Sequence, residues 1–137
     1  MKVLVDTNVV LDVLLARKPF ADAAAEIFGR IERSELEGFL CATTLTTVDY
    51  LITQSITGAE SRKALQHLME LFEVAPVNRP VIEEALRSRV VDFEDAVLEQ
   101  SARLAGVDVI VTRNTKDFRK SVVKTLDPDE LLSILQG

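Results

Sequence analysis

Short apolar runs alternate along the chain with longer segments in which apolar residues recur every three or four positions. The apolar runs, each predicted to be a strand, are residues 2–5, 39–42, 73–77, 107–112 and 122–126. The periodic segments, each predicted to be a helix, are residues 8–16, 21–33, 43–56, 60–71, 81–89, 95–105 and 129–135. Because strands alternate with helices and no Asn-Gly hairpin signal is present, the pattern favours βαβ units and a parallel sheet.

The predicted strands are almost wholly apolar, as at residues 3–5 and 39–42. Such strands are typical of a sheet that helices cover on both faces. We therefore expect a three-layer α/β/α domain with a central parallel sheet of about five short strands. Gly38 is expected to end the helix before the second strand. With 47% apolar residues and no repeat or linker, residues 1–137 are expected to form a single domain.

Cysteine content and hydropathy predict the compartment. Cys41 is the only cysteine, so no intrachain disulfide can form and a reducing environment is expected. The apolar runs are too short for a membrane span or for the apolar region of a signal peptide. We therefore expect a soluble cytoplasmic protein without a membrane partner.

The formal net charge of −6 argues against binding of nucleic acid through overall charge. That objection weakens if several of the carboxylates bind metal ions. Positive residues also gather around Asp117, namely Arg113, Lys116, Arg119 and Lys120. A basic rim around an acidic centre could hold phosphates, although an ordinary solvated loop has the same composition.

Two aspartates follow predicted strands. Asp6 comes directly after the first strand, and Asp117 lies in the polar loop after the fourth. Functional sites in open parallel sheets lie beyond the carboxyl ends of the strands, which favours a functional role for Asp6. Asp6 could instead cap the next helix, but Thr7 or Asn8 could do so equally well. Asp117 alone is weaker evidence, because turns favour aspartate and Asn114 offers another oxygen ligand in the same loop.

Asp49 falls on the buried side of a predicted helix. The apolar stripe of that helix consists of Leu45, Val48, Ile52 and Ile56. A carboxylate within this stripe needs a partner, because burying an unpaired charge is costly. The partner could be a basic side chain, a hydroxyl group of Thr46 or Thr47, or a metal ion, and the sequence leaves these open.

Asp92 and Asp95 lie at the start of another predicted helix. Asp92 is expected to be its N-cap, with Asp95 in the first turn, where a negative charge suits the helix dipole. Asp95 also begins a stripe that continues through Leu98 and Ala102, so it should point inward. This placement favours a functional role for Asp95.

Other catalytic chemistries find little support. His67 is the only histidine and lies within a predicted helix. The chain has no glycine-rich phosphate loop, no Cys-x-x-Cys pair and no Gly-x-Ser-x-Gly motif. Asp6-Thr7-Asn8 is similar to the Asp-x-Asp motif of phosphatases with an aspartate nucleophile, but Asn8 replaces the second acid. A phosphatase is therefore only a distant alternative.

Four segments together resemble a PIN-domain protein, in particular the VapC-type toxins of toxin–antitoxin pairs. These segments are residues 3–8, the threonine-rich helix with Asp49, Asp92-Phe93-Glu94-Asp95-Ala96 and residues 112–118. The resemblance extends over essentially the whole chain. It implies a metal-dependent ribonuclease with an α/β/α fold, a cognate antitoxin as partner and a homodimer.

The resemblance also implies a role for individual residues. The catalytic acids of the family fall on Asp6, Asp49, Asp95 and Asp117. Of these, Asp6, Asp95 and Asp117 are expected to bind Mg²⁺ or Mn²⁺, with Asn8 and Thr112 in support and Asn114 as an alternative ligand. The family more commonly has Glu where this chain has Asp49, which is one methylene shorter and is expected to reach the metal only through water.

The function implied is hydrolysis of RNA phosphodiester bonds by water bound to the metal, with Asp49 or Asp95 orienting the water. Arg113 and Lys116 would contact flanking phosphates of the RNA. The shortened acid and the net negative charge prompt an alternative, a catalytically weak PIN scaffold that binds RNA or a partner protein. In a third interpretation, the acids only cap helices and aid solubility.

Overall fold

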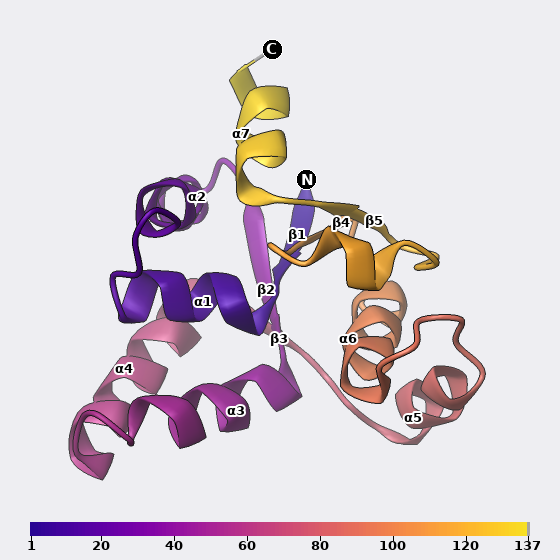
Figure 1. The fold of residues 1–137 in the computed structure, drawn as a ribbon, viewed down its shortest axis with the longest axis horizontal. Coiled ribbons are helices and arrows are strands. Elements are labelled where there is room, and N and C mark those ends of the chain that lie inside the picture. The colour runs from indigo at the N-terminus through magenta and orange to yellow at the C-terminus, as the bar shows by residue number, and fades with distance from the viewer. Residues whose placement is uncertain (137) are drawn as a thin grey trace.

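A five-stranded parallel sheet lies between two layers of helices in the computed structural model, which describes residues 1–136 (Figure 1). The strands are β1 (Lys2–Val5), β2 (Glu37–Cys41), β3 (Glu73–Ala75), β4 (Val109–Val111) and β5 (Lys124–Leu126). Their spatial order is β3-β2-β1-β4-β5, and every neighbouring pair is parallel. The three-layer α/β/α fold with a central parallel sheet is therefore confirmed.

Seven α-helices and one 3-10 helix connect and follow the strands within residues 1–136. They are α1 (Thr7–Leu14), α2 (Ala21–Glu32), α3 (Ala42–Ile52), α4 (Gly58–Leu71), α5 (Arg79–Leu86), α6 (Phe93–Leu104), the 3-10 helix η1 (Thr115–Phe118) and α7 (Pro128–Gln136). None of these helices is long and apolar enough to cross a membrane. The sequence predicted each α-helix with ends that differ by a few residues, but it placed η1 in a loop.

Apart from a charged first residue in β1, β2, β3 and β5, the strands are mainly apolar because both faces of the sheet are buried. In β1, Val3 and Val5 belong to the core cluster that includes α1, α2 and α7, whereas Leu4 belongs to the cluster that includes α6. Successive side chains of a strand point to opposite faces, so a strand between two helical layers needs an apolar residue at each position. Helix α5 packs mainly on α6 and lies outside the sheet (Figure 1).

The sequence predicted that Gly38 ends a helix, but this residue lies inside β2. A Cβ atom at this position would lie 2.8 Å from Ile31 Cδ1 and 2.8 Å from Phe72 Cδ1. The glycine therefore lets the helices α2 and α4 approach the strand closely. The preceding turn is made instead by Ser34, which has a positive φ of 62°.

Candidate acidic site

A hollow of about 350 Å³ lies beyond the carboxyl ends of β1 and β4, where α1 and α6 begin. Its lining includes Asp6, Asn8, Asp95 and Asn114. This is the edge of a parallel sheet at which ligands usually bind. The structure thus brings together side chains that are up to 108 positions apart in sequence (114 minus 6).

Asp6 is held by hydrogen bonds at both carboxylate oxygens. It is 7% exposed, and its Oδ1 accepts the backbone N–H of Thr7 at 2.7 Å, which makes Asp6 the N-cap of α1. Its Oδ2 accepts the Thr112 hydroxyl at 2.8 Å and the Asn8 amide at 3.2 Å. Asp6 is therefore both the helix cap and a member of the acidic site, although the sequence treated these roles as alternatives.

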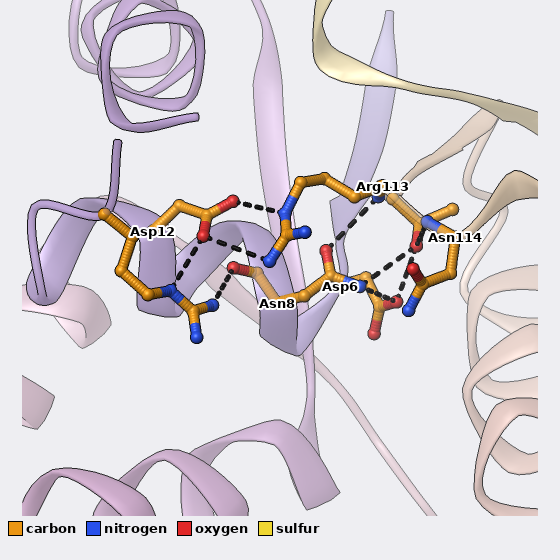
Figure 2. Close-up of polar contacts among 7 residues, drawn as sticks. Asp6, Asn8, Asp12, Arg113 and Asn114 are labelled. Carbon is orange, nitrogen blue, oxygen red and sulfur yellow. Dashed lines mark hydrogen bonds and ion pairs between the residues drawn. The ribbon is translucent and has the colours of Figure 1, made fainter. Parts of the chain in front are cut away.

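Asn8 and Thr112 connect α1 to the chain after β4. Asn8 Nδ2 also donates to Thr112 Oγ1 at 3.3 Å, and Asn8 Oδ1 accepts the backbone N–H of Arg113 at 3.2 Å (Figure 2). Thr112 Oγ1 in turn accepts the backbone N–H of Asn114 at 3.1 Å. These bonds fix the carboxylate of Asp6 and place Asn114 beside it.

Asp95 lies in the first turn of α6, behind the N-cap Asp92, whose Oδ1 accepts the Asp95 N–H at 3.0 Å. Partial burial, together with the negative charges of Asp6, Asp92, Asp117 and Glu94, raises the pKa of Asp95 to about 7. The pKa shift shows that Asp95 lies within the field of other site acids.

The charge of Asp117 also acts on Asp6. Burial raises the pKa of Asp6, hydrogen bonds from Thr112, Thr7 and Asn8 oppose that rise, and the charge of Asp117 adds to it. Asp117 is exposed and lies in η1, where its N–H donates to the Asn114 carbonyl oxygen at 3.0 Å. Of the three acids assigned to metal binding by resemblance, Asp6 and Asp95 line the hollow, whereas Asp117 lies outside its lining and acts on both through its charge.

A family model described as PIN domain matches residues 2–116 of the sequence. The chain belongs to the PIN-domain family. A comparison with curated protein sequences gives no match.

Solved structures of PIN proteins show the same fold. VapBC2 from Rickettsia felis, bound to promoter DNA, matches with a TM-score of 0.73 at 12% identity, covering 93% of this chain and 98% of the other. A toxin–antitoxin complex from Klebsiella pneumoniae matches with a TM-score of 0.71 at 22% identity, covering 92% and 97%. VapC20 from Mycobacterium tuberculosis, a toxin that cleaves the sarcin-ricin loop, matches with a TM-score of 0.60 at 17% identity, covering 79% and 86%.

The oxygen ligands of this PIN domain fit a hydrated ion better than a closed cage. Within residues 1–136, no group of three or more Asp, Glu, His or Cys side chains is close enough to hold one metal ion. Mg²⁺ usually keeps several water molecules and takes only one or two carboxylates from the protein. Asp6 and Asp95, which both line the hollow, are the carboxylates available to such an ion.

Asp49 makes its hydrogen bond away from this hollow. Its Oδ1 accepts the hydroxyl of Ser61, in α4, at 2.6 Å. The expected partners Thr46 and Thr47 donate instead to the carbonyl oxygen of Thr43, as hydroxyls in helices often do. The partly buried carboxylate of Asp49 thus has a hydroxyl partner, but on a neighbouring helix that the sequence did not indicate.

Asp12 is a buried acid that the sequence analysis overlooked. It is fully buried in α1 and forms ion pairs with Arg17 at 2.9 Å and with Arg113 at 2.7 Å (Figure 2). The guanidinium group of Arg113 also lies 4.0 Å from the ring centroid of Phe20. The position of Asp12 between Leu11 and Val13, in an apolar helix, was a signal that it needed a partner.

The Asp12 ion pairs bear on the expected contacts to phosphate. Arg113 directs its Nε and Nη2 donors to Asp12, so its guanidinium group is held against α1. Lys116 is exposed in η1. Of the two basic residues expected to contact RNA, Lys116 is the one that extends into solvent, whereas Arg113 anchors the chain that carries Asn114.

Proposed function

We propose that this PIN domain is an endoribonuclease that depends on Mg²⁺ or Mn²⁺ and hydrolyses RNA phosphodiester bonds. The observation that carries the proposal is the approach of Asp6 and Asp95 in one hollow at the carboxyl ends of β1 and β4, within the field of the charge of Asp117. PIN-domain nucleases generally depend on divalent metal ions. The similar fold of VapC20, a toxin that cleaves an RNA loop, supports RNA as the substrate.

In the proposed reaction, Asp6, Asp95 and Lys116 have different roles. Asp6, fixed by Thr112 and Asn8, supplies a carboxylate oxygen in a constant position. Asp95, in the first turn of α6, would orient the attacking water. A bound Mg²⁺ or Mn²⁺ ion would lower the pKa of that water and stabilise negative charge on the phosphate. Lys116 would attract a neighbouring phosphate.

The partners belong to the same proposal. Solved complexes of the similar VapBC and FitAB proteins support a cognate antitoxin, so the chain would be the toxin of a type II toxin–antitoxin pair. The family resemblance supports a homodimer. The lone cysteine, Cys41, supports a cytoplasmic location.

A second candidate is a catalytically weak PIN scaffold that binds RNA or a partner protein. The hydrogen bond between Asp49 and Ser61 favours it, because the acid assigned to the family's second catalytic position is engaged by another helix. Water-mediated assistance from Asp49 to the metal remains part of the leading proposal.

The two candidates are separated by a cleavage assay on structured RNA with Mn²⁺, with and without chelator. Asp6→Asn is the informative variant, because asparagine caps a helix about as well as aspartate and the fold should survive. Asp22→Asn, an exposed aspartate in the first turn of α2, is the matched control. We expect cleavage by the wild type and the control, and loss of roughly a hundredfold or more in Asp6→Asn, since oriented metal and charge stabilisation supply that order of rate.

Equal cleavage by wild type and Asp6→Asn would overturn the nuclease proposal. A wild-type protein that binds RNA but leaves it intact in Mn²⁺ would favour the scaffold. Asp49→Asn in the same assay measures the part of Asp49: asparagine can still accept the Ser61 hydroxyl, so we expect a smaller loss than in Asp6→Asn.

A further inference from the structure

A second hollow, of about 400 Å³, lies between α5, α6 and the segment 119–122 that follows η1. Four basic residues line it: Arg87, Arg89, Arg103 and Lys120. They come from the end of α5, the loop after it, α6 and the segment after η1. This concentration of positive charge stands out in a chain whose net charge is −6.

The hollow is shaped by a buried carboxylate with neutral partners. Glu99 is 1% exposed; its Oε1 accepts the Ser88 hydroxyl and the Gln100 amide, and its Oε2 accepts the Val122 N–H at 2.8 Å. These bonds join the loop after α5, the middle of α6 and the segment after η1. Because neutral donors satisfy Glu99, the surrounding cations are not needed as its direct partners.

The basic residues of the rim are only partly neutralised. Glu84 is shared by Arg87 at 3.6 Å and Arg103 at 4.0 Å, which are long contacts between exposed groups. Among the residues that the structure describes, Arg89 and Lys120 have no carboxylate within ion-pair distance. The hollow therefore offers free positive charge to an anionic ligand.

Two of the segments that line the hollow, α6 and the segment after η1, also lead to the acidic site. On α6, Asp95, Glu99 and Arg103 lie four positions apart on one face, so Arg103 is about 12 Å from Asp95 along the helix axis. The other element carries Asp117 in η1 and Lys120 three residues later. A nucleic-acid strand bound in the acidic site would thus reach the basic hollow within a few nucleotides.

We propose that this hollow binds a backbone phosphate of the RNA, a few nucleotides to one side of the bond that is cleaved. Arg89 and Lys120 supply the charge, and Arg103 contributes to the wall that α6 forms. The inference rests on the proposed function for the choice of RNA. The protein has a net charge of −6, which repels RNA. The hollow would give it a local positive surface to which RNA can bind.

The test measures binding of a single-stranded RNA of twelve nucleotides, in chelator so that cleavage does not interfere. Arg89→Gln/Lys120→Gln removes the two unpaired cations. Arg62→Gln/Lys63→Gln, on the exposed side of α4, is the matched control with the same change of charge. Loss of two phosphate contacts should lower the slope of log K against log salt by about 1.4 and weaken binding about tenfold or more at 0.1 M salt.

The inference holds if the hollow variant loses affinity and salt dependence while the control keeps both. It is overturned if both variants weaken equally, if neither weakens, or if the wild type does not bind the RNA. Lys120→Gln alone, in an exposed segment, gives the same decision with half the change of slope if the double variant fails to fold. Hollow-dependent binding without cleavage by the wild type would defeat the nuclease proposal alone, whereas cleavage without hollow dependence would defeat this inference alone.

Discussion

Asp6 and Asp95 are acids of one site in different surroundings. Asp6 is nearly buried, but three donors stabilise its ionised form. Asp95 accepts no comparable set of hydrogen bonds and has a pKa of about 7. Burial raises the pKa of both carboxyl groups, and neighbouring acids with raised pKa values are typical of functional sites.

The raised pKa of Asp95 predicts how stability depends on pH without divalent ions. Its pKa is above the ordinary value of 3.8, so the folded protein holds a proton that the unfolded chain has lost. The free energy of unfolding should therefore fall as pH rises from about 4 to about 7, and level off above that pH. We expect the free energy of unfolding of Asp95→Asn to fall less steeply across this window. Melts with chelator at several pH values would measure it. Identical pH profiles for the variant and wild type would contradict the assignment.

Asp12 gives a second prediction at the residue scale. Asp12→Asn removes the buried charge that holds Arg17 and Arg113. Breaking a buried ion pair costs about 3–5 kcal/mol, and we expect about 2–3 kcal/mol here because both arginines reach solvent. Urea denaturation would measure the loss, with Asp22→Asn as a control expected to change by less than about 0.5 kcal/mol. If Asp12→Asn were as stable as the Asp22→Asn control, the ion pairs would contribute nothing to the free energy of unfolding.

At the scale of elements, close packing at β2 supports one of the two helical layers. This layer consists of α1, α2, α3, α4 and α7. Gly38→Ala would place a methyl group 2.8 Å from Ile31 and Phe72, and overpacking of this kind costs about 1–3 kcal/mol. Gly58→Ala, at the start of α4, meets no atom within 4 Å and should be neutral or stabilising by up to about 1 kcal/mol. Thermal melts of the two variants would compare the sites. Equal stability of both would mean that the strand and helices shift freely.

The sequence predicted most elements correctly because their patterns are local. The apolar strands and amphipathic helices are defined by residues within one element, and Asp92 caps α6 as predicted. Gly38 and η1 were misread because a strand glycine and a helix-ending glycine look alike in sequence, and because one turn of 3-10 helix is too short for a periodic signal.

At the scale of the whole molecule, the acidic site couples metal binding to stability. An ion that binds the folded protein and not the unfolded chain stabilises it by mass action, by about 2.7 kcal/mol at a hundred times the dissociation constant. We expect Mn²⁺ to raise the melting temperature of the wild type and of Asp22→Asn, and to have little effect on Asp6→Asn. Scanning calorimetry with and without chelator would measure it. A rise of equal size in Asp6→Asn would place the ion elsewhere.

By itself, the sequence determined the order of elements, the doubly covered parallel sheet and the position of Asp6 at a strand end, because these follow from local periodicity and from the geometry of parallel sheets. Tertiary structure decided the partners. Asp49 pairs with Ser61, and Asp12 pairs with Arg113 across 101 positions of sequence. A side chain's charge can be read from the sequence, but its partner depends on which distant segments the fold brings within hydrogen-bond distance. The same reason applies to the basic hollow, whose residues gather only when α5, α6 and the segment after η1 pack together.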